Sequence, residues 1–243
     1  AGGVLKVYLA VALAVGDSAL LFQPGLAGAK ATLSARDGLT GQERWSVPTD
    51  CGSLRLPIAC GARIAAVCSK DNQTLIALDA TTGEELWATR APNNTGAMAC
   101  DDEVLHITTV GPDGGLASYS LSTGEARGAR YVTGYYNAPI RSGDKLLLLD
   151  DLAVWGYTAP DQEIVWLHSR DQRVLWFDMS YGLREGQFLL PRPDSIESID
   201  IQTGKVSRRW TFPGLTYESN QMAATPFISA SQNRLLATWV RED

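Results

Sequence analysis

The chain has 243 residues, of which 45% are hydrophobic and 20% are charged, as is ordinary for a folded globular protein. Its 21 Lys and Arg against 27 Asp and Glu give a net charge of -6, which argues against nucleic acid as a partner because a phosphate-binding face needs clustered basic residues. The longest apolar run, residues 7–16, is well short of the ~20 residues that a membrane-spanning helix requires, so we expect no spanning segment in this chain and leave open an anchor outside it.

Short apolar segments, separated by turn residues, follow one another along the chain. Their length and alternation predict β-strands rather than helices. In chain order, we expect strands at residues 4–9, 10–15, 19–22, 33–37, 56–60, 63–68, 75–79, 104–110, 137–142, 145–150, 173–179, 223–230 and 234–240. The sequence therefore predicts an all-β protein.

One phrase recurs with a period near 40 residues. Residues 33–45 read LSARDGLTGQERW, and residues 75–87 repeat the phrase as LIALDATTGEELW. Worn copies at 116–128 and 196–210 place the glycines of the four copies 42, 41 and 80 residues apart, and a degenerate copy at 153–166 fills the double gap. A fixed period of this length, with a turn and an aromatic residue in each unit, indicates a repeat architecture.

Each copy combines a strand, a turn and a second strand. In the second copy, apolar residues alternate over 75–79, which predicts a strand buried on at least one side. The following Asp-x-x-Thr-Gly reverses the chain, because the acid accepts backbone N–H bonds and glycine supplies a positive φ. Two more short apolar runs precede each such hairpin. Four strands in a repeat of about 40 residues are typical of a β-propeller blade.

These repeats resemble the blades of the quinoprotein-like propeller family, which carry Ala-x-Asp-x-x-Thr-Gly-x-x-x-Trp. The first two copies match this pattern in full, the third lacks the Asp and the Trp, the degenerate copy lacks Thr-Gly, and the last has a longer final spacing. The resemblance implies that the tryptophan of one blade docks against a neighbouring blade. The residues of this structural blade motif are Asp37, Gly41, Trp45, Asp79, Gly83, Trp87, Gly124, Trp166, Asp200, Gly204 and Trp210.

The repeats predict a single β-propeller domain over residues 1–243, with about six four-stranded blades. Five blades end near residues 45, 87, 128, 166 and 210, and the last, 211–243, is incomplete. We expect residues 2–9 to supply its outer strand, so that the chain ends close the ring and remove free strand edges. One inner strand would still be missing, so a piece of a ring of seven or eight blades is the alternative.

Four cysteines lie in two adjacent blades, and none has the spacing of a metal-binding pair. In a four-stranded meander, Cys51 and Cys68 share one face of a hairpin, whereas Cys60 and Cys100 lie in equivalent turns of neighbouring blades. The topology therefore favours the disulfides Cys51–Cys68 and Cys60–Cys100, as expected for a secreted, periplasmic or cell-surface protein. Four buried thiols in a cytosolic protein are the alternative.

Few residues indicate a binding or catalytic centre. The two histidines exclude a histidine-rich metal site, and His106 lies in an apolar strand, as expected for a core residue. The acidic pair at 150–151 is the best calcium candidate, but calcium needs six to eight oxygens. Trp176 in the expected first strand of the fifth blade, with Tyr181 and Arg184 in the following turn, is a candidate binding site at the mouth of the central channel. Packing is the alternative role for this trio.

Two kinds of function are compatible with these blades. The resemblance to bacterial envelope propellers implies a non-catalytic, extracytoplasmic module that binds a protein partner or acts as a scaffold, without cofactor or metal. The resemblance to pyrroloquinoline-quinone-dependent dehydrogenases implies a fragment of a longer enzyme with quinone and calcium, but the sequence has neither adjacent cysteines nor a haem-attachment Cys-x-x-Cys-His. A ligand-sensing ectodomain is a further alternative. We expect the protein-binding propeller rather than the enzyme.

Overall fold

The computed structural model describes residues 11–23, 30–69, 73–110, 114–131, 139–149, 153–158, 163–169, 182–184, 186–192, 195–211, 227–231 and 234–238. The chain divides into two compact units, an N-terminal unit of Ala1–Thr133 and a C-terminal unit of Gly134–Asp243, and each is described by itself. The described residues form strands and turns without a helix. They accordingly provide no helix of the length and apolarity that a membrane crossing requires.

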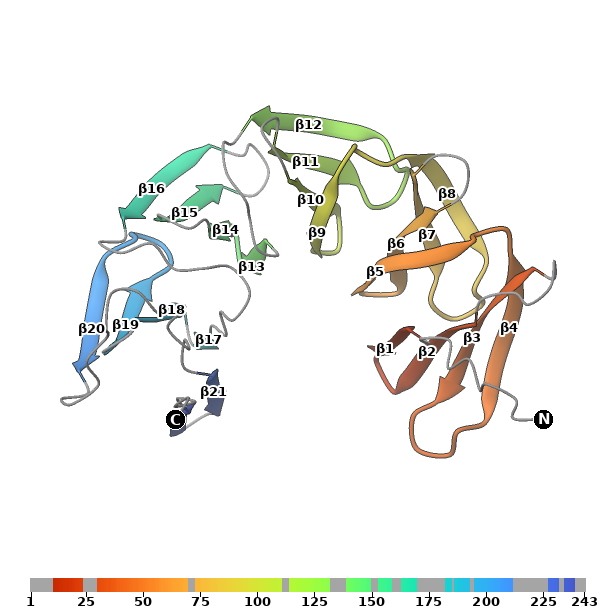
Figure 1. Ribbon diagram of the computed structural model, residues 1–243, viewed down its shortest axis with the longest axis horizontal. Helices are drawn as coiled ribbons and strands as arrows, with labels where there is room; N and C mark the ends of the chain where they lie inside the picture. Colours follow the sequence, from red (N-terminus) through yellow and green to blue (C-terminus); the bar gives the residue numbers. More distant parts are fainter. Residues whose placement is uncertain are drawn as a thin grey trace, which may run out of the picture. The chain divides into compact units, whose positions relative to one another are not determined.

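The described part of the N-terminal unit contains three four-stranded antiparallel sheets, which we call blades 1 to 3 (Figure 1). In each of them, strands that follow one another in the chain are also neighbours in the sheet. Blade 1 consists of β1 (Val11–Val15), β2 (Ser18–Gln23), β3 (Ala31–Asp37) and β4 (Glu43–Thr49). Blade 2 consists of β5 (Ser53–Cys60), β6 (Arg63–Ser69), β7 (Gln73–Asp79) and β8 (Glu85–Arg90). Blade 3 consists of β9 (Thr95–Cys100), β10 (Val104–Thr109), β11 (Gly115–Ser120) and β12 (Ala126–Tyr131).

The described part of the C-terminal unit repeats the same meander twice and adds a two-stranded sheet. Blade 4 consists of β13 (Ile140–Ser142), β14 (Lys145–Leu149), β15 (Ala153–Thr158) and β16 (Ile164–Ser169). Blade 5 consists of β17 (Gly182–Arg184), β18 (Gln187–Pro191), β19 (Ser195–Asp200) and β20 (Val206–Thr211). The last pair is β21 (Phe227–Ser231) and β22 (Arg234–Thr238).

These sheets confirm the prediction of an all-β protein built from four-stranded antiparallel blades. The five described blades end at Thr49, Arg90, Tyr131, Ser169 and Thr211, a few residues beyond the motif positions that mark them in the sequence. Residues 2–9 lie outside the described residues. The single domain, the closed ring and the number of blades remain predictions.

The hydrophobic core lies between successive blades rather than within one sheet. Leu33 of blade 1 packs in one cluster with Ile64 and Ile76 of blade 2, and Leu75 of blade 2 joins Leu105 of blade 3 in the next. In the C-terminal unit, a third cluster joins blades 4 and 5 in the same way. Middle strands are therefore covered on both faces, which explains why β14 is buried at every position and reads as a continuous apolar run.

The first strands of blades 2 and 5 begin elsewhere than the sequence pattern predicts. β5 starts at Ser53 rather than residue 56, because a register shift between Arg55 and Ile58 accommodates Pro57 within the strand. In blade 5, the first strand is β17, whereas the pattern places it at 173–179, which lies outside the described residues.

Arg184 ends β17 and pairs with Gln187, so it is a strand residue rather than the turn residue we expected. Gly186 explains the difference, because its φ of 76° closes a two-residue turn at that point.

Candidate functional site

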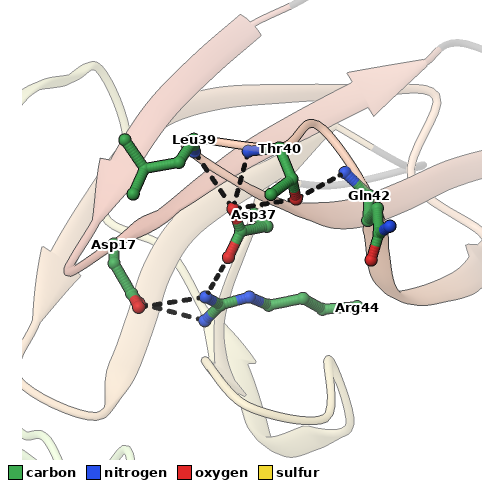
Figure 2. Close-up of polar contacts among 6 residues, drawn as sticks. All are labelled: Asp17, Asp37, Leu39, Thr40, Gln42 and Arg44. Carbon is green, nitrogen blue, oxygen red and sulfur yellow. Dashed lines mark hydrogen bonds and ion pairs between the residues drawn. The ribbon is translucent and has the colours of Figure 1, made fainter.

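The Asp-x-x-Thr-Gly turn of blade 1 is held by its own aspartate (Figure 2). Oδ1 of Asp37 accepts hydrogen bonds from the backbone N–H groups of Leu39 (3.1 Å) and Thr40 (2.8 Å) and from the Thr40 hydroxyl (3.0 Å). The N–H of Gly41 donates to the carbonyl of Asp37 at 2.8 Å and closes the turn. The aspartate therefore replaces backbone partners that the reversing chain cannot provide.

Arg44 joins this turn to the first turn of the same blade (Figure 2). Its guanidinium donates to both carboxylate oxygens of Asp17, each at 3.0 Å, and to Oδ2 of Asp37 at 2.6 Å. These bonds from Arg44 lower the pKa of both carboxyl groups, and the pKa of Arg44 is raised in return. The Asp17 side chain is largely solvent-exposed and those of Arg44 and Asp37 are partly exposed, so this network is a charged clamp at the edge of blade 1.

The later copies of the turn use the same bonds. Oδ1 of Asp79 accepts from the hydroxyl and the N–H of Thr81 and from the N–H of Thr82. Oδ1 of Asp200 accepts from the hydroxyl and the N–H of Thr203, both at 2.8 Å. These bonds lower the pKa of both aspartates. Blade 3 carries Ser120 at this position, and its hydroxyl accepts the N–H of Thr123 at 3.3 Å. A serine therefore preserves the turn with a weaker, uncharged acceptor.

Each docking tryptophan donates a hydrogen bond to the turn of the next blade. Nε1 of Trp45 donates to the carbonyl of Ala80 at 3.0 Å, Nε1 of Trp87 to the carbonyl of Leu121 at 2.9 Å, and Nε1 of Trp166 to the carbonyl of Ile201 at 2.8 Å. In every case the acceptor is the residue directly after the Asp or Ser of the turn. The motif therefore couples the turn of one blade to the tryptophan of the preceding blade.

The motif glycines are required by the close approach of these tryptophan rings. A Cβ atom on Gly83 would lie 2.5 Å from the ring of Trp45, and one on Gly124 would lie 2.5 Å from the ring of Trp87. Both glycines also have φ near 75°, where other residues are strained. Ring and glycine thus fit only as a pair, and the repeated residues in the described blades hold the blades together rather than perform chemistry.

Trp210 does not occupy the docking position of its blade. Trp87 pairs across its hairpin with Ala77 and Trp166 with Gly156, but the corresponding partner in blade 5, Ser198, faces Arg208. Trp210 lies two residues further along β20. The longer final spacing thus shifts Trp210 along the strand relative to Trp87 and Trp166, and its docking against a following blade stays a prediction. The Arg208 guanidinium instead lies over the Trp210 ring, 4.9 Å from its centroid.

Both disulfides that the topology favours are present. Cys51, in the loop before blade 2, is bonded to Cys68 of β6, and their Cα atoms are 5.2 Å apart. Cys60 of β5 is bonded to Cys100 of β9, with Cα atoms 5.8 Å apart, so this bond joins blade 2 to blade 3. No cysteine is left unpaired.

A buried ion cluster in the C-terminal unit has no counterpart in the sequence motifs. Glu197 of β19 is fully buried, and its Oε2 lies 2.9 Å from Nε of Arg192 and 3.2 Å from Nε2 of His168, which belongs to blade 4. Arg209 of β20 donates to its Oε1. Burial alone would raise the pKa of Glu197, but the bonds from His168 and the two arginines lower it to about 2. The carboxylate therefore stays charged and links blade 4 to blade 5.

The proposed channel-mouth site cannot be assembled from the described residues. Trp176 and Tyr181 lie outside them, and for Arg184 only the backbone of β17 is described. The acidic pair at 150–151 also lies outside them. His106 is buried in β10, with Nδ1 2.8 Å from the hydroxyl of Ser118, in keeping with a core residue.

The described residues do not fit the quinone and calcium that the resemblance implies. Calcium requires several converging oxygen ligands. The described part of the chain brings no three His, Cys, Asp or Glu side chains together in a way that could hold a metal ion. Its four cysteines are bonded across separations of 17 and 40 residues, so none forms a ring between adjacent cysteines. We therefore derive no chemical step through either group.

Comparisons with solved structures show the fold. A computationally designed protein, Ika8, matches with a TM-score of 0.66 at 12% identity, over 93% of this chain and 66% of that protein. BamB from Moraxella catarrhalis matches with a TM-score of 0.50 at 16% identity, over 92% of this chain and 79% of BamB. The quinohemoprotein alcohol dehydrogenase ADHIIG from Pseudomonas putida HK5 matches with a TM-score of 0.53 at 14% identity, over 82% of this chain but 41% of that enzyme. The chain thus spans less than two thirds of the designed protein and of the dehydrogenase.

A family comparison goes further than these distant structural matches. No curated protein matches the sequence significantly. The family model described as outer membrane protein assembly factor BamB, however, matches residues 29–238, which is most of the chain. The matched segment contains the turns, the docking tryptophans and both disulfides of the described blades. The chain therefore belongs to the BamB-like family of β-propellers with quinoprotein-like repeats.

Proposed function

We propose that this chain is a non-catalytic, extracytoplasmic β-propeller module that binds or scaffolds a protein partner in the cell envelope. One observation carries the proposal: at the interfaces between blades 1 and 2, 2 and 3, and 4 and 5, the repeated motif residues are engaged in docking. Trp45, Trp87 and Trp166 each bond the next blade, and the glycines beneath them fit closely against the tryptophan rings. Function is then left to the surfaces and loops around a rigid frame.

Two further observations support this proposal. The Cys51–Cys68 and Cys60–Cys100 disulfides favour an oxidising compartment, since thiols of cytosolic proteins are kept reduced. Membership of a family described as an outer membrane protein assembly factor favours the cell envelope and a protein partner. We propose that the module works without pyrroloquinoline quinone or calcium.

A ligand titration tests the cofactor-free part of the proposal. Pyrroloquinoline quinone and calcium would be added together to the purified protein while the absorbance and the melting temperature are followed. A ligand that binds only the native state must raise the apparent stability. We expect neither signal to change. A saturable spectral change with a raised melting temperature would overturn the proposal in favour of a dehydrogenase fragment.

Cross-linking in intact cells tests the protein-binding part. A lysine-reactive cross-linker that enters the cell envelope would be applied to cells that produce the protein, and the products would be identified by mass spectrometry. We expect a reproducible cross-link from the propeller to one envelope protein. Cross-links to cytosolic proteins alone, or none above those of an unrelated envelope protein of similar abundance, would contradict the proposal.

A further inference from the structure

The interface between blades 1 and 2 is incompletely filled. A cavity of about 440 Å³ lies beside the docking contact of Trp45, between the end of β4 and the start of β8. Its floor is formed by buried apolar side chains of both blades and by the Cys51–Cys68 disulfide. The floor side chains are Phe22, Leu33, Leu54, Ile76 and Leu78. This volume is within the range of sites that bind small ligands or single bulky side chains.

A small residue at the outer wall leaves this space open. Ala88 follows the docking Trp87 in β8 and is exposed at the edge of the cavity. The equivalent residue in blade 4 is Leu167, which also follows its docking tryptophan. A leucine at the alanine position would extend into the space. Ala88 is thus the position at which a larger side chain would narrow the cavity.

A second cavity adjoins the first along β8. It has a volume of about 380 Å³ and shares Thr74 and Ala88 with the first cavity. Gln73 lines it, and the buried Oε1 of this side chain accepts no hydrogen bond from the described part of the chain. The two cavities form one groove, which we call the β8 groove.

The first cavity of the β8 groove has an acidic mouth, whereas Arg90 lines the second cavity. Glu84 and Glu85 line the outer wall of the first cavity, and both are exposed. Among the described residues, no cationic side chain pairs with either of them, whereas the nearby Asp50 is paired with Lys30 at 2.8 Å. An apolar floor beneath an acidic mouth matches a ligand with an apolar group and an adjacent positive charge.

We propose that the β8 groove binds a segment of a partner protein in which a bulky apolar side chain is followed by Lys or Arg. The apolar side chain fills the first cavity, and the cation lies against Glu84 and Glu85. This proposal rests on the proposed protein-binding function and names the chemistry of the partner segment. An extended segment suits the groove because its N–H groups are available along one edge.

Fluorescence anisotropy with labelled hexapeptides tests the proposal. One peptide carries phenylalanine followed by lysine, and two controls replace the lysine by glutamate or the phenylalanine by glycine. We expect the phenylalanine-lysine peptide to bind about tenfold or more tightly than either control, because like charges at the mouth oppose binding. Equal affinity for all three peptides would overturn the proposal. So would saturable binding of dodecylamine without binding of the peptide, since the groove would then take a free amphiphilic amine.

Matched variants connect the binding to the groove. Ala88→Leu fills the first cavity, and we expect it to weaken peptide binding about tenfold, because the apolar side chain loses its site. Ser46→Leu makes the same change at the equivalent exposed position of blade 1, outside the groove, and is expected to leave binding unchanged. Equal effects of the two variants, or none from Ala88→Leu, would overturn the proposal. Circular dichroism and melting temperatures verify that both variants fold.

Charge variants separate the mouth from the floor. The double variant Glu84→Gln, Glu85→Gln is expected to weaken binding several-fold and to reduce its dependence on salt, as screening of exposed charges implies. Glu125→Gln changes the equivalent turn of blade 3 and serves as the control. If Ala88→Leu leaves the cellular cross-link intact, the groove proposal fails while the protein-binding function stands. If the wild-type protein itself forms no cross-link to an envelope protein, the protein-binding function is contradicted instead.

Discussion

In the N-terminal unit, the Cys60–Cys100 disulfide joins blades 2 and 3, whereas in the C-terminal unit ion pairs of the buried Glu197 join blades 4 and 5. Both units use the same tryptophan docking, through Trp87 in one and Trp166 in the other. The repeated motif thus provides a common contact, and each unit adds its own second link. A covalent link and an electrostatic link differ in what breaks them, so reduction should loosen the contact between blades 2 and 3, and acid the contact between blades 4 and 5.

The difference also shows where a repeat protein is free to vary. The docking contact needs a glycine and a tryptophan from successive blades, and a change in one requires a change in the other. The second links lie outside the motif, at β5 and β9 in one unit and at β16 and β19 in the other. Stability in repeat proteins is approximately a sum of repeats and nearest-neighbour interfaces, so each interface can be strengthened separately.

The largest expected effect is the loss of a docking tryptophan. Because both units use this contact, its removal should lower the unfolding free energy of each unit by a similar amount. Trp87→Ala and Trp166→Ala each remove a buried ring and a hydrogen bond, and we expect each to cost about 3–5 kcal/mol of unfolding free energy. Urea unfolding followed by circular dichroism measures the loss. Trp45→Ala is the comparison, since this half-buried ring should cost less. A loss below that of Trp45→Ala would contradict the docking role.

Removal of the inter-blade disulfide should distinguish the units. The double variant Cys60→Ala, Cys100→Ala is expected to destabilise the N-terminal unit by about 2–5 kcal/mol, because the unfolded chain is no longer constrained over 40 residues. Hydrogen exchange resolved by mass spectrometry should show faster exchange in blades 2 and 3. The C-terminal unit contains none of the four cysteines and is the internal control. Faster exchange in blades 4 and 5 alone would refute the assignment.

Acid should destabilise the C-terminal unit through Glu197. The pKa of Glu197 is about 2 in the folded protein and ordinarily 4.5, so the unfolded chain binds the proton more tightly. The resulting stability is present above pH 4.5 and is lost as the pH falls toward 2, by about 3 kcal/mol at most. Hydrogen exchange in blade 5 between pH 6 and pH 3 measures it, after correction for the intrinsic exchange rate.

The variant Glu197→Gln isolates this contribution from that of the exposed aspartates. It should lower the stability at pH 7, because Arg192 is then buried without its carboxylate. It should also flatten the acid dependence of blade 5. An unchanged acid dependence would show that the stability lost in acid comes from other groups.

The blades were predictable from the sequence because their determinants are local. The Asp-x-x-Thr-Gly turn at 37–41 needs only residues within one hairpin, and the docking tryptophan follows at a fixed spacing. The disulfides were predictable because the blade topology brings Cys60 and Cys100 into neighbouring first strands.

The remaining features depend on contacts that no short pattern carries. Glu197 meets His168, 29 residues away, and Arg209, 12 residues away, on separate strands. Nothing in the sequence around Ala88 indicates that this residue lines a cavity. The shift of Trp210 follows from strand register, which the longer spacing after Gly204 leaves ambiguous in the sequence alone.

The smallest expected effect concerns this shifted register. Arg208 occupies the position of the docking tryptophan in blade 5 and lies over the ring of Trp210. Arg208→Ala should cost about 0.5–1 kcal/mol, because an exposed cation over an aromatic ring contributes little. Arg208→Lys keeps the charge and should lose less. Urea unfolding at low and high salt measures both variants. A cost as large as that of Trp166→Ala would mean that Arg208 itself docks a further blade, and the difference between blades 4 and 5 would disappear.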